Sequence, residues 1–146
     1  MNKFDERILR KLKSNGRLSN VELAESIGLS PSATLRRVQD LERSGVIKGY
    51  RAVLDPNKLG ISFFAYVTIG LSNHSKKSQL EFEGHIKVAD EVTECHNVTG
   101  MNEYLLRVET ADLSAYKRFH SDVLGEIPQV NSIQTLVVME SPKDER

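Results

Sequence analysis

Apolar residues between positions 19 and 41 recur at three- and four-residue spacing, which predicts two short helices joined by a turn. Ser19 followed by Glu22 has the capping-box pattern of a helix start, and Gly28 accommodates the positive φ that ends a helix. Ser30 then caps a second helix. Two short helices joined in this way are typical of a helix-turn-helix unit.

The second of these helices has two different faces. Leu35, Val38 and Leu41 are predicted to form a narrow inward stripe, and Thr34 leans toward the same side. The outer face is polar and basic, as in helices that enter the major groove of DNA. A surface helix of an ordinary bundle would share these features, but the spacing of the turn residues favours helix-turn-helix. The DNA-contacting candidates in this segment are Ser30, Ser32, Ala33, Arg36, Arg37 and Gln39.

Residues 1–54 are predicted to form one unit around this pair of helices. A helix beginning at about Lys3 precedes the pair, and residues 46–54 are rich in β-forming side chains, which predicts a linker strand or a strand pair. Lys48 and Arg51 are candidates for phosphate contacts, or else ordinary charges at a strand edge.

The second half of the chain has a different rhythm. Residues 61–71 alternate in a way that predicts a strand with one wholly apolar and one mixed face. Further segments complete the order β-α-β-β-α-β of a ferredoxin-like domain; they are expected at residues 76–89, 92–99, 104–109, after Asp112, and at 133–139. The mixed face of the sheet needs a cover, for which a second subunit is the simplest. Its large side chains are Phe64, Tyr66, Leu105, Leu136 and Val138.

Charge divides the chain at about Asp55. Residues 1–54 contain 11 Lys and Arg against 6 Asp and Glu, a net charge of +5, whereas residues 55–146 contain 9 against 14, a net charge of −5. A basic first half indicates that this half alone binds a polyanion. The single Cys95 excludes an intrachain disulfide, and neither a signal peptide nor a membrane-spanning run is visible. We therefore expect a cytoplasmic protein that does not contact membranes.

The chemistry-bearing residues do not form the pattern of an enzyme. Cys95 and His96 are neighbours on a predicted strand, so their side chains point to opposite faces. The remaining histidines lack metal-ligand spacing, and no Gly-rich phosphate loop is present. We expect no catalytic residue, metal or cofactor. Two alternatives remain open, a metal-sensing role and a small-molecule-binding or enzymatic ferredoxin-like domain with a helical cap, although the basic first half favours neither.

Motifs in a specific order extend over nearly the whole chain, at residues 4–9, 15–20, 23–24, 27–32, 35–38, 41–50, 54–56, 59–60, 94–95, 98–100 and 104–108. Together they resemble the Lrp/AsnC family of bacterial and archaeal transcription regulators, also called feast/famine regulatory proteins. The resemblance implies an α+β chain, with a winged helix-turn-helix domain over residues 1–54 and a ferredoxin-like, effector-binding and oligomerisation domain over residues 55–146. It also implies homodimers that often assemble into octamers, with small effectors, usually amino acids, bound where dimers meet.

These expectations assign roles within a sequence-specific regulator of transcription. A dimer would present two recognition helices to successive major grooves of double-stranded DNA. Ser32, Arg36 and Gln39 are the candidates for base edges. Phosphate contacts, which give affinity and register rather than sequence preference, are assigned to Arg37, Lys48 and Arg51.

The effector site expected from the resemblance lies at the turn before residue 104, beside the last strand. This turn usually reads Gly-Asp-x-Asp in the family, whereas residues 100–103 here read Gly-Met-Asn-Glu. One acid is lost and Met101 adds an apolar wall, which favours a neutral amino acid with a branched or sulfur-containing side chain over lysine or arginine. A plain hairpin turn with a degenerate site is the alternative. The candidate effector-binding residues are Thr99, Gly100, Met101, Asn102, Glu103, Tyr104, Gln134 and Leu136.

Overall fold

The computed structural model describes all residues 1–146, which divide into two compact units. The N-terminal unit comprises Met1–Val53 and the C-terminal unit Leu54–Arg146, so the division falls one residue from the predicted boundary. No helix of the structure is both long and apolar enough to cross a membrane.

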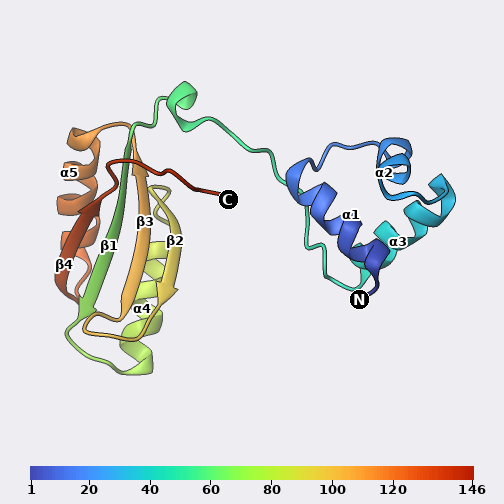
Figure 1. The fold of residues 1–146 in the computed structure, drawn as a ribbon. Coiled ribbons are helices and arrows are strands. Elements are labelled where there is room, and N and C mark those ends of the chain that lie inside the picture. The colour runs from blue at the N-terminus through green and yellow to red at the C-terminus, as the bar shows by residue number, and fades with distance from the viewer. The chain divides into compact units, whose positions relative to one another are not determined.

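Three helices build the N-terminal unit: α1 (Lys3–Ser14), α2 (Asn20–Ile27) and α3 (Pro31–Arg43) (Figure 1). Each begins at a polar side chain that accepts backbone N–H groups, and α2 ends at Gly28 with a φ of 78°. The predicted caps Ser19 and Ser30 are confirmed. The core of the unit consists of apolar side chains from all three helices, namely Ile8, Leu23, Ile27 and Leu41.

The inward stripe of α3 differs from the prediction at one position. Leu35 is 46% exposed, whereas Thr34 is fully buried, so Thr34 rather than Leu35 belongs to the core side. Burial of Thr34 leaves no polar atom unsatisfied, because its hydroxyl donates to the carbonyl of Ser30 at 2.9 Å. Leu35 is thereby placed on the outer face of α3.

The predicted linker strand at residues 46–54 is absent from the structure, and this prediction is wrong. A β-strand needs a neighbouring strand to pair its backbone groups, and the N-terminal unit contains no strand that could serve as one. The segment instead contacts α3 through two isolated hydrogen bonds. Ile47 N–H donates to the Leu41 carbonyl at 3.0 Å, and the Tyr50 hydroxyl donates to Glu42 at 3.0 Å.

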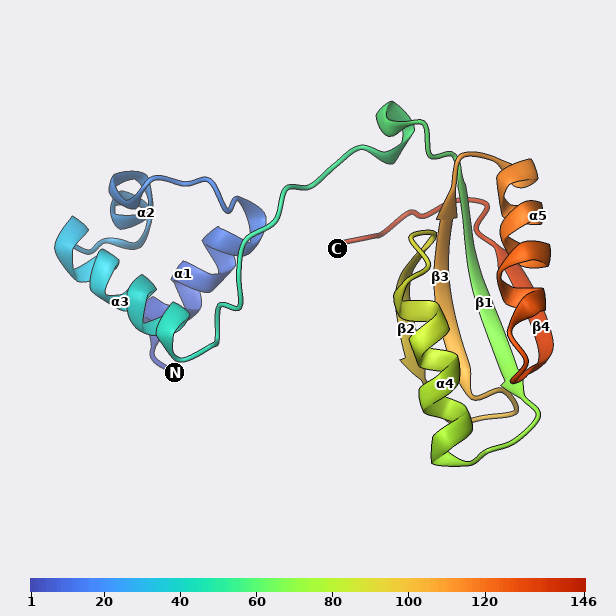
Figure 2. The same cartoon turned by 180° about the vertical axis from the view of Figure 1, so that it is seen from behind.

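The C-terminal unit is a four-stranded antiparallel sheet with two helices on one face (Figures 1 and 2). The strand order is β2-β3-β1-β4, and the β-α-β-β-α-β sequence of elements is as predicted. The elements are a 3-10 helix η1 (Pro56–Leu59), β1 (Phe63–Leu71), α4 (Lys76–Lys87), β2 (Val92–Asn97), β3 (Tyr104–Thr110), α5 (Leu113–Asp122), a second 3-10 helix η2 (Leu124–Glu126) and β4 (Val130–Val137).

The predicted alternation along β1 is confirmed. Ala65, Val67 and Ile69 are fully buried beneath the helices, where they pack with Phe82 of α4 and Phe119 of α5. The intervening residues point to the opposite side of the sheet, which we call the open face. Figure 1 views this open face, and Figure 2 shows α4 and α5 in front of the sheet.

An arginine lies at the centre of the open face. The Arg107 side chain is only 5% exposed, and its guanidinium carbon lies 5.3 Å and 5.4 Å from the ring centroids of Phe64 and Tyr66. Arg107 Nη1 donates to the Tyr66 hydroxyl at 3.0 Å, but Nε has no hydrogen-bond partner.

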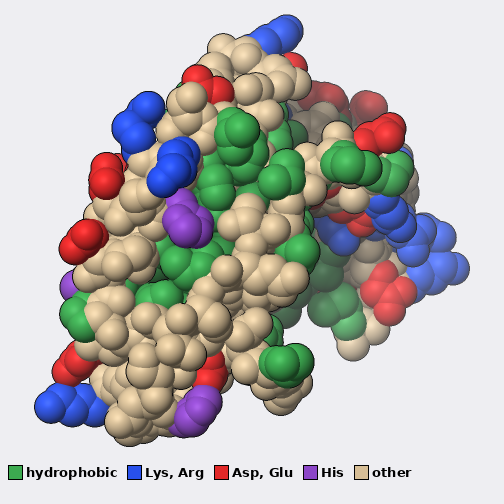
Figure 3. Space-filling view, turned by 90° about the vertical axis from the view of Figure 1, so that its left-hand side faces the viewer, with side chains coloured by type: hydrophobic (Ala, Val, Ile, Leu, Met, Phe, Trp, Pro, Cys, Tyr) green, Lys and Arg blue, Asp and Glu red, His purple; other side chains and the backbone are tan.

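Hydrophobic side chains also reach the surface on the side of α5 and β4 (Figure 3), where Leu113, Leu136 and Val137 are exposed.

Candidate DNA interface and effector site

The outer side of α3 carries four exposed side chains at helical spacing: Ser32, Leu35, Arg36 and Gln39. Positions separated by three, four and seven residues share one face of a helix, so these side chains form one stripe, which we call the reading face. The ion pairs of α3 are made by Arg37 and Arg43, which leaves the Arg36 guanidinium without one. A face with these groups has donors and acceptors for base edges and, at Leu35, an apolar group for a thymine methyl.

Arg37 has an intramolecular role that the sequence did not reveal. Its Nη1 lies 3.2 Å from Asp5 Oδ1, and its guanidinium carbon lies 5.4 Å from the centroid of the Phe4 ring. Both partners belong to α1, so Arg37 holds α3 against α1. The structure therefore separates Arg37 from the neighbouring Arg36, whose side chain is exposed.

The remaining DNA candidates lie at the two ends of α3. The Ser30 hydroxyl accepts the N–H of half-buried Ala33 at 3.2 Å, so its first task is to cap the helix. Lys48 and Arg51 are exposed in the irregular segment after α3. Sequence reasoning did not identify Asn20, which positions the two helices. Its side-chain amide donates to the Pro31 carbonyl at 2.7 Å and links the start of α2 to the start of α3. No sequence pattern identifies a bond between these two helix starts.

The turn between β2 and β3 carries most of the candidate effector residues. Gly100 has a φ of 121°, which only glycine adopts without strain. Thr99 is exposed and Met101 is almost fully exposed. The turn is closed where Val98 N–H donates to the Glu103 carbonyl at 2.8 Å. The tip of the turn is therefore accessible to a ligand.

A polar cluster on the open face joins this turn to β4. The Asn102 amide donates to the Thr68 hydroxyl at 3.2 Å and accepts from the Ser132 hydroxyl at 3.3 Å. Thr68 in turn donates to Gln134 at 3.5 Å. A Cβ atom at Gly70 would lie 2.3 Å from Ser132 Oγ and 2.8 Å from Asn102 Oδ1, so glycine makes room for the cluster.

The structure thus links Asn102 to Gln134 through Thr68, and Ser132 of β4 bonds to Asn102 as well. Sequence reasoning missed both Thr68 and Ser132. Leu136 is exposed on the open face, two residues along β4 from Gln134. The sequence could predict this arrangement only in part. Residues two apart on a strand share a face, so Gln134 and Leu136 could be grouped. Placing them beside the turn required the pairing register of the strands.

Glu103 already has two partners. Its Oε2 accepts the N–H of Leu71 at 2.8 Å, and its Oε1 lies 2.5 Å from Nδ1 of His74. These contacts tie the end of the turn to the segment that follows β1. The one carboxylate among the candidate effector residues is thus already paired with a side chain of the same chain.

Tyr104 lies on the helix-covered side of the sheet, away from the polar cluster. It is 1% exposed, its ring packs 4.6 Å from that of Phe82, and its hydroxyl donates to Glu83. Burial raises the pKa of Tyr104 above its ordinary value, and the bond to Glu83 adds to this effect. The Tyr104 side chain therefore does not share a surface with Asn102 and Gln134.

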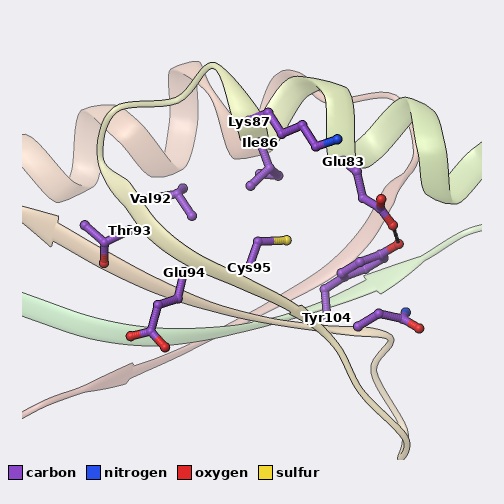
Figure 4. Close-up of a pocket in the computed structure, with 9 residues that line it drawn as sticks. Glu83, Ile86, Lys87, Val92, Thr93, Glu94, Cys95 and Tyr104 are labelled. Carbon is purple, nitrogen blue, oxygen red and sulfur yellow. Dashed lines mark hydrogen bonds between the residues drawn. The ribbon is translucent and has the colours of Figure 1, made fainter. Parts of the chain in front are cut away.

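A groove of about 350 Å³ lies between α4 and β2 (Figure 4). Cys95 points into it toward α4, whereas Glu94 points away. Cys95 is exposed, but partial desolvation in the groove raises the pKa of its thiol above the ordinary value. His96 contacts Glu94 at 3.0 Å instead of Cys95. The structure contains no group of three or more His, Cys, Asp or Glu that could hold a metal ion.

Comparison with known proteins agrees with this geometry. A family model described as winged helix-turn-helix DNA-binding matches residues 1–48, and one described as Lrp/AsnC ligand binding domain matches residues 64–146. The leucine-responsive regulatory proteins of Escherichia coli K12 and Salmonella typhimurium LT2 are each 40% identical over 143 residues, which is 98% of this chain and 87% of each relative.

Solved structures extend the likeness to the whole fold. A transcriptional regulator of Neisseria meningitidis in complex with L-Met has a TM-score of 0.95 at 33% identity, covering 99% of this chain and 93% of its own. The AsnC protein of Escherichia coli has a TM-score of 0.90 at 28% identity, covering 99% and 95%.

Proposed function

Because this chain belongs to the Lrp/AsnC family of DNA-binding transcriptional regulators, which are not enzymes, we propose specific roles for its residues. The reading face of α3 contacts base edges in the major groove, with Arg36 bonding to guanine, Gln39 to adenine and Leu35 packing on a thymine methyl. The observation that carries this proposal is the exposure of Ser32, Leu35, Arg36 and Gln39 on one face of a capped helix.

Phosphate contacts flank this face. Ser30 and Ala33 lie at the N-terminal end of α3, where backbone N–H groups and the helix dipole favour an anion. Lys48 and Arg51 contact phosphates on the other side. Arg37 contributes its charge to the same field while it remains bound to Asp5.

Binding of DNA should weaken steeply with salt, because each phosphate contact releases condensed counterions. The log–log slope of affinity against salt should change by about −0.9 per contact. Replacing both Lys48 and Arg51 with alanine should make the slope shallower and reduce binding to operator and random duplexes alike. Fluorescence anisotropy over a salt series measures both slopes. An unchanged slope in the double variant would remove these two residues from the interface.

A dimer is the form proposed to bind DNA. The open face carries partly exposed Phe64, Tyr66 and Leu105 and the exposed Leu136, a surface that a second copy would cover. Two copies of α3 would then address successive major grooves, about one helical turn or a multiple of it apart. Further assembly of dimers into octamers is part of the same proposal.

A fragment comprising Leu54–Arg146 should therefore fold and be at least dimeric, and it should not bind DNA. Its own sheet and helices supply a complete core, and its open face supplies the contact between copies. Circular dichroism and light scattering test this expectation, with the full chain as the reference. A folded fragment that remains monomeric at micromolar concentration would contradict the dimer proposal.

The effector proposed for the C-terminal unit is a neutral amino acid. The structurally similar regulator of Neisseria meningitidis was solved with L-Met, and the exposed Met101 offers a soft apolar wall. The site comprises the turn and β4 beside it, where Asn102 and Gln134 provide polar groups. Around them lie Thr99, Gly100, Met101, Glu103 and Leu136, with Tyr104 supporting the turn from the core side.

The effector acts by binding one arrangement of the protein more tightly than another. Mapping of genomic binding sites with and without each candidate amino acid tests both halves of the proposed function. Sites that share one motif and shift in occupancy with a neutral amino acid are the expected result. Occupancy that ignores every amino acid would refute the effector assignment and leave the DNA assignment intact.

A further inference from the structure

Glu103 and His74 form an ion pair of unequal exposure. The Glu103 side chain is 14% exposed, and its two oxygens have different partners, the backbone N–H of Leu71 and the ring of His74. The His74 side chain is 76% exposed. The carboxylate is therefore held in place, while its imidazole partner lies at the surface.

The His74 ring can leave this position at little cost. Its contact with Glu103 is the only hydrogen bond or ion pair of its side chain in the structure. On the His74 side the contact is exposed to solvent, which screens the attraction, and holding the ring in place costs side-chain freedom. The Leu71 N–H bond, by contrast, remains when the ring moves away, so Glu103 keeps an oriented and unpaired Oε1.

An α-amino acid carries the group that would replace the ring. Its ammonium has three N–H donors and a full positive charge, and a carboxylate oxygen in a partly buried position is a strong partner for it. The neighbouring residue Asn102 belongs to the polar cluster with Thr68 and Ser132, so further polar groups lie beside Glu103. The position of His74 Nδ1 thus marks where an ammonium nitrogen would sit.

We propose that His74 is an internal stand-in for the effector ammonium: it pairs with Glu103 in the free protein, and a bound amino acid displaces it. This inference rests on the proposed effector site at the turn between β2 and β3. His74 then sets the affinity threshold of the sensor, because every effector competes with it. Displacement also releases the loop between β1 and α4 from its contact with Glu103. His74 lies in this loop, one residue before Ser75, which is the N-cap of α4.

Calorimetric titration of the full chain tests the competition. The probes are L-methionine and its analogue without the amino group, 4-(methylthio)butanoate. His74→Ala should bind L-methionine about 1.4- to 5-fold more tightly than the natural chain, which corresponds to the usual strength of an exposed ion pair. It should bind the analogue with unchanged affinity. Glu103→Gln should weaken L-methionine about tenfold or more and leave the analogue unaffected, because the charged partner of the ammonium is lost.

Nuclear magnetic resonance of the His74 ring protons gives a second readout that a merely structural role would not move. Saturating L-methionine should shift these signals to the positions that they have in Glu103→Gln, where the ion pair is absent. Ring signals that do not move while L-methionine binds would overturn the role of His74 and leave the effector site standing. If neither the natural chain nor His74→Ala binds any of the twenty amino acids, the effector site and this inference both fail.

Discussion

Replacing Arg36 with alanine should cost about 1–3 kcal/mol of binding free energy on the operator, which is about a fivefold to 150-fold loss of affinity. The reason is that Arg36 is an exposed, unpaired guanidinium on the reading face of α3, so the bidentate bond proposed between Arg36 and a base has no replacement. Preference at one base position should relax at the same time. Selection of bound duplexes from a randomised pool, followed by anisotropy on the selected site, measures both effects.

The adjacent Arg37 provides the matched control, because it carries the same charge on the same helix. Arg37→Ala removes the contact with Asp5 and the packing on Phe4, so it should lower the melting temperature of the N-terminal unit. The ratio of operator to random binding should change little. If Arg36→Ala leaves the ratio of operator to random binding unchanged and Arg37→Ala lowers it, the proposed orientation of α3 is wrong.

Replacing Ile8 with alanine should cost about 2–5 kcal/mol of folding free energy and unfold the N-terminal unit near physiological temperature. Ile8 is fully buried in a core that three helices share, and a unit of 53 residues has little stability to lose. DNA binding should disappear while the C-terminal unit stays folded. Calorimetry should then show one transition well below the other.

Leu35→Ala is the control for this experiment, since it removes a comparable aliphatic side chain from the exposed face of α3. It should change the folding free energy by no more than about 0.5 kcal/mol, as surface substitutions usually do. A single cooperative transition in Ile8→Ala, with both units unfolding together, would contradict the independence of the two cores.

Local signals made most of the fold predictable. Caps such as Ser19 and Ser30 act on backbone groups within three residues, and the alternation along β1 reports burial directly. Leu35 was assigned to the wrong side because apolarity alone favours leucine for the core, whereas the inward position predicted for Thr34 is confirmed. The hydrogen bond from Thr34 to Ser30, which makes burial of the threonine possible, is visible only in three dimensions.

The errors and omissions share one cause, which is dependence on partners distant in sequence. Residues 46–54 have strong β propensity, but no strand pairs with them in the chain. The cluster of Asn102, Thr68 and Ser132 depends on the register between strands, and the pairing of His74 with Glu103 joins two loops. The family resemblance indicated the turn as the effector region, but it could not indicate which side chains there were already engaged.

The reading face has a consequence for how such regulators diverge. Arg36 and Gln39 are exposed, and the ion pairs of α3 involve other residues, so the fold does not depend on either side chain. The bonds that orient the helix come instead from Arg37 and Asn20. With the base contacts proposed for the reading face, substitutions there are expected to alter operator preference at almost no cost in folding. A duplicated gene could acquire new target promoters through these few codons while the rest of the recognition unit stayed under purifying selection.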